Sequence, residues 1–156
     1  MSETTLRDYL GKVERDFKRG ISTEHSYRGT LQDLLETLNS NVTATNEPKR
    51  IKYGAPDYVI ERNRGTNTFT VGYVEAKDAG MNLDEIERDA RLSEPKTREG
   101  KQLKRYLHAL DNLVFTNYLE FRWYLHGEKR ATATLSTPQS DKTWAKPVDG
   151  TNVLRK

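Results

Sequence analysis

The sequence contains no cysteine. Without thiols the chain cannot form disulfides, thiolate zinc sites or a cysteine nucleophile, so any bound metal must use oxygen or imidazole ligands. Long apolar runs are also missing, because none approaches the ~20 residues that span a bilayer. The N-terminal segment also lacks the apolar centre of a signal peptide. We therefore expect a cytoplasmic protein without a membrane partner.

Several catalytic motifs are absent as well. The sequence has no Gly-rich phosphate loop of the Walker type and no Gly-x-Ser-x-Gly elbow. Its histidines, His25, His108 and His126, do not have the spacing of a zinc site. We interpret them as surface or packing residues, and the corresponding enzyme classes are not supported.

Length and composition predict one domain. Of the 156 residues, 34% are hydrophobic and 31% are charged, which is enough for one compact core with a strongly solvated surface. We place this domain at residues 1–136 and a polar linker or tail at residues 137–156, where the composition is polar, proline-bearing and aperiodic. The net charge of +3 and the pI near 9.0 favour a polyanionic partner only slightly.

Two amphipathic helices are predicted near the N-terminus. The first covers residues 6–19, and the second begins after Ser22 or Thr23 and ends near Leu38. At about 100° per residue, Glu24 lies within roughly 30° of the centre of the second apolar stripe, and Glu36 lies about 140° away. We therefore expect Glu24 to point inward and Glu36 outward. An inward acid needs a cation or a metal, although Glu24 could also simply suit the positive end of the helix dipole.

The central feature is a predicted β-hairpin. A first strand at residues 42–53, broken near Pro48, precedes two strand-like segments, residues 54–61 and 70–77, which a polar turn at residues 63–67 joins. Because the hairpin is antiparallel, the start of its first strand lies beside the end of its second. With alternating side chains, this arrangement brings Asp57 close to Glu75 and Lys77.

The remaining elements complete an α/β domain. A helix begins at Asn82 or Asp84 and reaches about residue 91, and another covers residues 101–111. Between them, residues 93–100 are predicted to form a mobile charged loop, usually plain solvated surface, which could contact a DNA backbone if it lies beside an acidic cluster. Strands follow at residues 112–117, 119–125 and 131–135. We predict a central mixed β-sheet flanked by helices.

The hairpin carries groups that suit phosphodiester hydrolysis. Carboxylates on adjacent strands offer oxygen ligands to Mg²⁺, which needs only one or two protein acids. A neighbouring lysine can lower the pKa of an attacking water or stabilise developing negative charge. A Glu-x-Lys pair alone is usually an exposed ion pair, so the interpretation depends on its context.

That context resembles a known superfamily. Pro56-Asp57 on one strand and Glu75-Ala76-Lys77 on the next, after a helix with an inward Glu24, resemble the PD-(D/E)XK nucleases. Gln102 and Tyr106 are similar to the Gln-x-x-x-Tyr element of some branches. Together with residues 23–28 and 46–50, these motifs resemble the N-terminal Mrr-like nuclease domain of single-chain ATP-dependent (Type ISP) restriction-modification enzymes.

The resemblance implies a restriction-endonuclease-like core and a role for each site residue. Asp57, Glu75 and Glu24 would ligate Mg²⁺, for which Mn²⁺ could substitute, and Lys77 would position or activate water. The supporting or DNA-contacting residues would be Gln102, Tyr106 and, as a phosphate contact, Arg28.

The expected function is Mg²⁺-dependent cleavage of double-stranded DNA as one module of a larger enzyme. Its helicase-like ATPase, methyltransferase and target-recognition domains would lie elsewhere in the full-length chain. The alternatives are a catalytically silent DNA-binding or assembly module of the same fold and a stand-alone junction- or end-processing nuclease.

Overall fold

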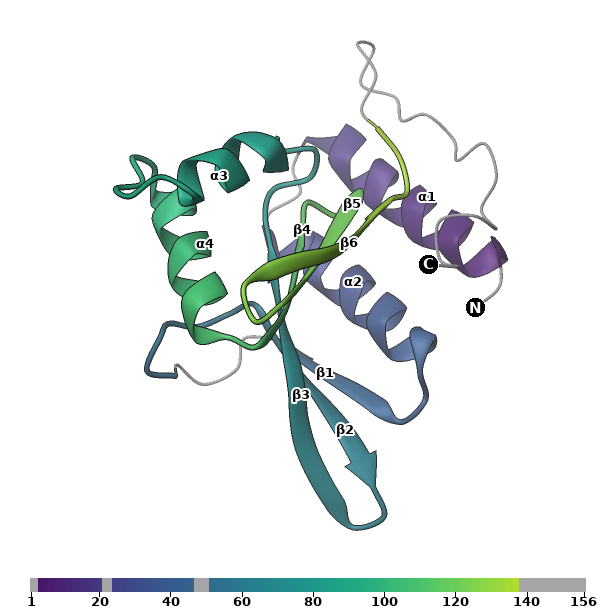
Figure 1. Ribbon diagram of the computed structural model, residues 1–156. Helices are drawn as coiled ribbons and strands as arrows, with labels where there is room; N and C mark the ends of the chain where they lie inside the picture. The colour runs from purple at the N-terminus through teal and green to yellow at the C-terminus, as the bar shows by residue number, and fades with distance from the viewer. Residues whose placement is uncertain (1–2, 21–23, 47–50, 138–156) are drawn as a thin grey trace.

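The computed structural model of the protein describes residues 3–20, 24–46 and 51–137. The proposed caps Ser22 and Thr23, the strand break at Pro48 and residues 138–156 of the predicted tail lie outside this part. Figure 1 shows the elements in chain order: α1 (Glu3–Arg19), α2 (Glu24–Leu38), β1 (Val42–Asn46), β2 (Tyr58–Arg64), β3 (Asn67–Ala76), α3 (Leu83–Ala90), α4 (Arg98–Ala109), β4 (Asn112–Thr116), β5 (Glu120–Leu125) and β6 (Glu128–Thr134).

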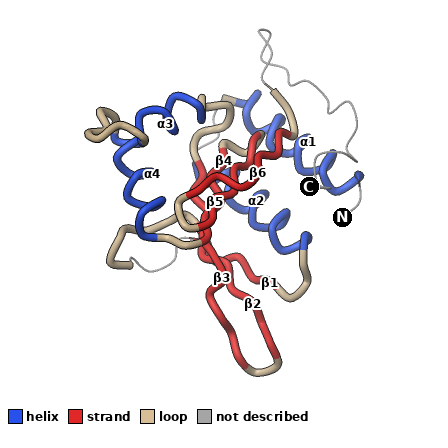
Figure 2. The backbone as a smooth tube through the Cα atoms, in the orientation of Figure 1, coloured by secondary structure: helices blue, strands red, loops and turns tan. Residues whose placement is uncertain are grey.

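The strands form one six-stranded sheet in the order β1-β2-β3-β4-β5-β6. Strands β3 and β4 are parallel, and every other neighbouring pair is antiparallel. A parallel pair needs a crossover connection, which α3 and α4 supply between β3 and β4 (Figure 2). The predicted α/β fold with a mixed sheet and flanking helices is therefore confirmed.

Helices cover both faces of the sheet, and each face has its own core. Figure 1 shows α1 and α2 on one side and α3 and α4 on the other. Strand β3 divides its side chains between them: Val74 and Ala76 pack with α1 and α2, and Tyr73 packs with α3 and α4. This alternation is the one expected from the sequence, and it leaves Glu75 on the same face as α4.

The chain between β1 and β2 differs from the prediction. Ile51 does not extend a strand of the sheet, because it exchanges backbone hydrogen bonds with Gly54 at 2.8 and 3.1 Å and so closes a tight turn. Gly54 has a φ of 131°, a conformation that residues with a Cβ rarely adopt. The prediction of a strand at residues 51–53 was therefore wrong, and these residues instead turn the chain toward Asp57.

The end of α2 also departs from its helical-wheel interpretation. The apolar stripe expected from the sequence extends from Tyr27 to Leu38, but Leu38 is 48% exposed. Glu36, expected to point outward, is half-buried, and its Oε1 accepts a hydrogen bond from the Ala44 N–H at 3.0 Å. The cause is tertiary: β1 folds back beside α2 and contacts a flank that the helix alone leaves to solvent.

The predicted loop before α4 is shorter than expected and is fixed by Asp89. Residues 98–100 already belong to α4, whose N-cap is Thr97. The Asp89 carboxylate accepts hydrogen bonds from the backbone N–H of Lys96 and Thr97, both at 2.9 Å, and from the Thr97 hydroxyl at 2.6 Å. A side chain on α3 therefore determines where α4 begins.

Among the described helices, none has the length and apolarity required to cross a bilayer.

Candidate active site

The hairpin of β2 and β3 brings together the three residues predicted to meet there. Asp57 directly precedes β2, where Tyr58 pairs with Val74 of β3. Asp57 Oδ2 accepts a hydrogen bond from the Ala76 N–H at 2.8 Å, and Lys77 Nζ donates to Glu75 Oε1 at 2.8 Å. The antiparallel pairing thus places Asp57, Glu75 and Lys77 at one end of the hairpin.

Lys77 is held from two directions. Its backbone N–H donates to the Thr116 carbonyl at 2.8 Å, which continues the parallel pairing of β3 with β4 beyond Ala76. Its ammonium donates to Glu75 and also to Gln102 Oε1 of α4. Gln102 therefore reaches the site, as the sequence predicted, and it fixes the lysine side chain.

Helix α2 contacts the same site through Arg28. Arg28 Nη2 lies 3.0 Å from Asp57 Oδ1, and the Arg28 side chain is almost fully buried. The Tyr58 hydroxyl donates to the Arg28 carbonyl at 2.8 Å and so attaches this turn of α2 to β2. Arg28 thus pairs with Asp57, and the phosphate contact expected of it stays a prediction. Sequence reasoning missed Tyr58, although its inward position next to Asp57 follows from strand alternation.

Glu24 is the first residue of α2, and its side chain lies outside the described part of the structure. Residues four apart share one face of a helix, so Glu24 lies on the same face as Arg28. Its predicted role as a metal ligand stays a prediction.

Tyr106 supports the chain that leads to Asp57. It is buried, and a Cβ added to Gly54 would lie 2.9 Å from its hydroxyl oxygen. Burial and the nearby charge of Glu75 raise the pKa of Tyr106. Tyr106 therefore packs against the turn at Gly54, and its expected role of supporting the site or contacting DNA stays a prediction.

Asp57, Glu75, Lys77 and Gln102 line a cleft of about 340 Å³. Asp57, Glu75 and Lys77 form one side, and Gln102, Arg98 and Glu99 from the first turn and a half of α4 form the other. The sequence assigned Arg98 and Glu99 to a loop and did not include them among the site residues. The sequence did offer a hint, because this charged segment was expected to be able to contact DNA if it lay beside an acidic cluster. In the structure, Arg98 and Glu99 line the same cleft as Asp57 and Glu75.

Glu75 is a buried carboxyl group in the cleft with a strongly shifted pKa. It is 4% exposed, and burial raises its pKa to about 7, with a smaller contribution from Asp57, while the Lys77 ammonium acts in the opposite direction. Its Oε2 atom is buried and has no hydrogen-bond partner among the described residues. A buried carboxylate oxygen without a donor is costly, and an added cation would relieve that cost.

The donor set fits a hard divalent cation. Asp57 and Glu75 offer carboxylate oxygens, and Mg²⁺ needs only one or two such ligands because it keeps several waters or binds phosphate oxygens. Within the described residues, no group of three or more His, Cys, Asp or Glu side chains is arranged to hold a metal. The pair of Asp57 and Glu75 is therefore the candidate site, with the Glu24 side chain outside the described part.

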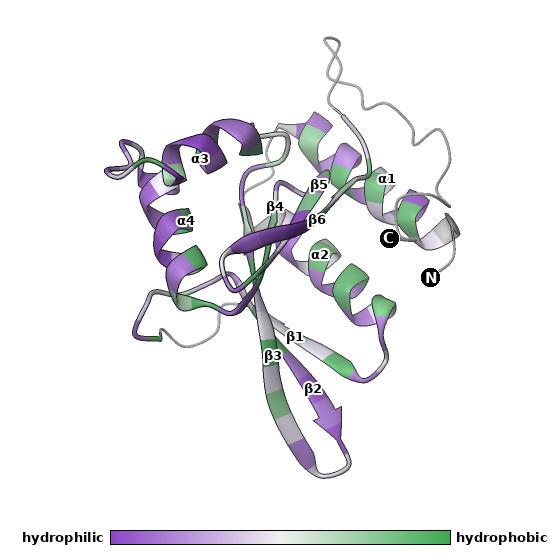
Figure 3. Ribbon diagram, viewed as in Figure 1, coloured by the Kyte–Doolittle hydropathy of each residue, from purple (hydrophilic) through white to green (hydrophobic). Residues whose placement is uncertain are grey.

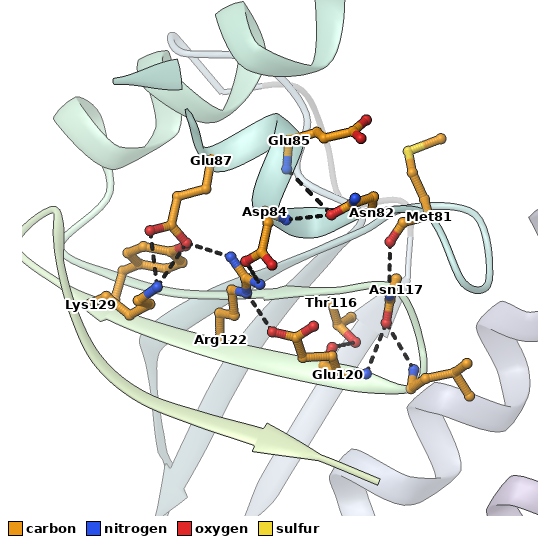
Figure 4. Close-up of polar contacts among 12 residues, drawn as sticks. Met81, Asn82, Asp84, Glu85, Glu87, Thr116, Asn117, Glu120, Arg122 and Lys129 are labelled. Atoms are coloured by element: carbon orange, nitrogen blue, oxygen red, sulfur yellow. Dashed lines mark hydrogen bonds and ion pairs between the residues drawn. The ribbon is translucent and has the colours of Figure 1, made fainter. Parts of the chain in front are cut away.

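A second charged cluster lies between α3 and strands β5 and β6 (Figure 4). Arg122, 4% exposed, contacts Glu87 and Glu120 at 2.6 Å and Asp84 at 2.5 Å. Glu87 also accepts from Lys129 at 3.0 and 3.1 Å. None of these side chains lines the cleft of Asp57 and Glu75.

Both oxygens of Glu87 are saturated with donors. Besides Arg122 and Lys129, the Tyr124 hydroxyl and Arg91 Nη2 each donate to Glu87 at 2.8 Å. Burial by itself would raise the pKa of Glu87, but these hydrogen bonds, from Lys129 above all, lower it to about 2. The cluster joins α3 to the sheet, and both carboxylate oxygens of Glu87 accept hydrogen bonds within it.

Comparison with known proteins finds a likeness of fold but none of sequence. No protein-family model matches the sequence, and no curated protein sequence matches it. Among solved structures, the fold is similar to a chain of the cryo-electron-microscopy structure of a DrdV–DNA complex, with a TM-score of 0.63. The two chains are 20% identical, and the alignment covers 85% of this chain and 87% of the other. At this identity the likeness shows a shared fold.

Proposed function

We propose that this chain is a Mg²⁺-dependent endonuclease domain that hydrolyses phosphodiester bonds of double-stranded DNA. The observation that carries the proposal is the meeting of Asp57, Glu75, Lys77 and Gln102 in one cleft, where Glu75 keeps a buried oxygen without a donor among the described residues. Perturbed, under-satisfied carboxyl groups in a cleft are typical of catalytic sites.

Asp57 and Glu75 would hold the metal ion. A bound Mg²⁺ would supply Lewis-acid stabilisation of the negative charge on the phosphate, and Mn²⁺ would substitute for it. Arg28 and the Ala76 N–H orient the two oxygens of Asp57, which presents this carboxylate to the cleft in a fixed geometry. Glu24, one turn before Arg28, is proposed as a further acidic ligand.

Lys77 is suited to act on water or on the phosphate. An ammonium group has three N–H donors, and Glu75 and Gln102 engage two of them. We assign the third to the attacking water or to a phosphate oxygen, where a fixed positive charge stabilises the charge that develops in the transition state.

DNA as the substrate is supported by the fold. The matched DrdV chain was solved in a complex with DNA, and a shared fold alone makes this support an analogy. We further propose that the chain is the cleavage module of a larger restriction-modification enzyme, whose helicase-like ATPase, methyltransferase and target-recognition domains supply specificity and timing.

Plasmid nicking tests this function. Supercoiled DNA is incubated with the chain in Mg²⁺ or in EDTA, and the intact protein is compared with Asp57→Asn and Lys77→Met. We expect Mg²⁺-dependent nicking that both substitutions abolish. The matched controls, Asp8→Asn and Lys12→Met on the exposed side of α1, should nick like the intact protein. Nicking that persists in the Asp57 and Lys77 variants would refute the site.

The second candidate is a catalytically silent DNA-binding or assembly module. The observation in its favour is that Arg28 pairs with Asp57 and Lys77 pairs with Glu75, so each acid already has a cationic partner. This module predicts DNA binding without nicking at any Mg²⁺ or Mn²⁺ concentration, including with an excess of protein.

A further inference from the structure

Helix α4 carries a row of basic side chains on its outer surface. Arg98, Lys101 and Arg105 follow one another at spacings of three and four residues, so they share one face of the helix. All three are exposed, and Figure 3 shows α4 mostly in hydrophilic colours. We call these three residues the basic stripe.

The stripe is not neutralised by neighbouring acids. Among the described residues, Arg98 and Lys101 have no ion pair or side-chain hydrogen bond, and Arg105 Nε donates to the Tyr53 carbonyl at 2.8 Å. The nearest acid in the helix sequence, Glu99, lies about 100° around the axis from Arg98 and is half-buried toward the cleft. The positive charge of the stripe is therefore available to a partner.

The stripe begins at the cleft and leads away from it. Arg98 lines the cleft with Glu75 and Lys77. Arg105 lies seven residues further along, about 10 Å at 1.5 Å per residue, which is the axial length of about three base pairs. Beyond it, the hydrogen bond to Tyr53 brings the stripe next to the turn that carries exposed Lys52. The positive charge thus continues outward from the candidate catalytic residues.

We propose that the basic stripe binds the phosphate backbone of duplex DNA and leads one strand into the cleft at Asp57 and Glu75. This inference rests on the proposed function and adds the surface by which the substrate is held. Because the contacts are to phosphates, the stripe contributes affinity and register and carries no base sequence information.

The chemistry of the surface favours a nucleic acid over a membrane or a protein groove. The large apolar residues of α4 face the core: Leu103 and Tyr106 are buried, and Leu107 is half-buried and packs against the same cluster. The exposed face therefore has no apolar row that could insert into a lipid surface or anchor a partner helix. A row of cations on a helix face that lacks an apolar row matches the regularly spaced phosphates of a nucleic acid.

Salt-dependent DNA binding is the first test. Fluorescence anisotropy with a 20-base-pair labelled duplex in EDTA compares the intact chain with Lys101→Gln/Arg105→Gln over a range of KCl. Two lost phosphate contacts should weaken binding about tenfold or more near 0.1 M salt and reduce the slope of log K against log salt by about 1.8. Lys101→Gln alone should show about half of this change, and it leaves the Arg105 contact to Tyr53 intact.

The matched control removes the same charge elsewhere. Lys12→Gln/Arg15→Gln changes two exposed basic residues of α1, on the opposite side of the sheet. It should leave the salt slope unchanged. An unchanged slope in the α4 variants, or an equal loss in the α1 variant, would overturn the proposal.

Cross-linking gives a direct second test, because the chain has no natural cysteine. A photo-cross-linker attached through Lys101→Cys should label duplex DNA, and the same reagent attached through Lys12→Cys should not. Equal labelling from both positions, or labelling from Lys12→Cys alone, contradicts the proposal. Neither binding test depends on cleavage, so Mg²⁺-dependent nicking with an inert stripe would refute this inference alone, and stripe-dependent binding without nicking would refute the nuclease alone.

Discussion

Glu75 and Glu87 are two buried glutamates with opposite chemistry. Their exposures are similar, 4% and 7%, and both lie beside cations. Glu87 accepts hydrogen bonds from Arg122, Lys129, Tyr124 and Arg91, which lower its pKa to about 2 despite burial. Glu75 has Lys77 on one oxygen and no donor on the other among the described residues, and burial raises its pKa to about 7.

The two glutamates are similarly buried, so the number of hydrogen-bond donors distinguishes the structural acid from the candidate catalytic one. Burial raises the free energy of any carboxylate, and only donors offset that cost. At Glu87 the donors come from α3, β5 and β6, so the charge is satisfied and stabilises the fold. At Glu75, one carboxylate oxygen has no donor among the described residues. A cation bound in the cleft could compensate the charge on that oxygen.

Exchanging each glutamate for glutamine should give the largest contrast. We expect Glu75→Gln to reduce the rate of Mg²⁺-dependent plasmid nicking by about 10² or more, because one of two proposed metal ligands is lost. Glu87→Gln should nick at the rate of the intact chain per folded molecule. Equal rates for Glu75→Gln and the intact chain would remove Glu75 from the site.

The effects of the two substitutions on the free energy of unfolding should be the reverse of their effects on nicking. Glu87→Gln leaves the Arg122 guanidinium with less compensating charge and should lower the free energy of unfolding by about 3 kcal/mol. Glu75→Gln should leave it unchanged or higher at pH 8. Urea denaturation at pH 8 in EDTA measures both values, and an unaltered midpoint for Glu87→Gln would show that the cluster at Arg122 contributes little.

The pH dependence of stability should also distinguish them. The folded pKa of Glu75 lies above its ordinary value near 4.5, so its favourable contribution is present below pH 4.5 and is lost as the pH rises to about 7. The folded pKa of Glu87 is about 2, so its contribution is present above pH 4.5 and is lost as the pH falls toward 2.

Between pH 5 and pH 8 the stability of the intact chain relative to Glu75→Gln should therefore fall by about 2 kcal/mol. Relative to Glu87→Gln it should stay constant over the same range. Urea midpoints at the two pH values, in EDTA, test this difference. A constant gap to Glu75→Gln would mean that the Glu75 carboxyl titrates normally in the folded protein.

The outer partners of the two clusters should give the smallest effects. Gln102→Ala removes an acceptor that positions Lys77 and should slow nicking about tenfold without a change in thermal midpoint. Arg91, whose side chain is 61% exposed, contributes a peripheral ion pair to Glu87. Arg91→Ala should cost less than about 1 kcal/mol and leave nicking intact. A larger effect of Arg91→Ala on nicking than of Gln102→Ala would reverse the proposed roles.

Local patterns in the sequence were enough to place the central site residues. Alternation along two strands and the antiparallel sense of a hairpin placed Asp57 near Glu75 and Lys77, whereas only the family resemblance pointed to Gln102 and Tyr106. The same local rules failed where one element packs against another. Glu36 is drawn to the Ala44 N–H because β1 lies beside α2, and residues 51–53 turn back because Gly54 permits it.

The sequence by itself determined the element types, the mixed α/β class and the order in which charged side chains emerge along each strand and helix, because these depend on residues close together in the chain. Only the tertiary structure decided which of the two buried glutamates, Glu75 or Glu87, has hydrogen-bond donors on both carboxylate oxygens. The donors to Glu87 and the missing donor to Glu75 Oε2 depend on side chains from elements distant in sequence. A pKa near 2 or near 7 is therefore a property of packing, which no local pattern contains.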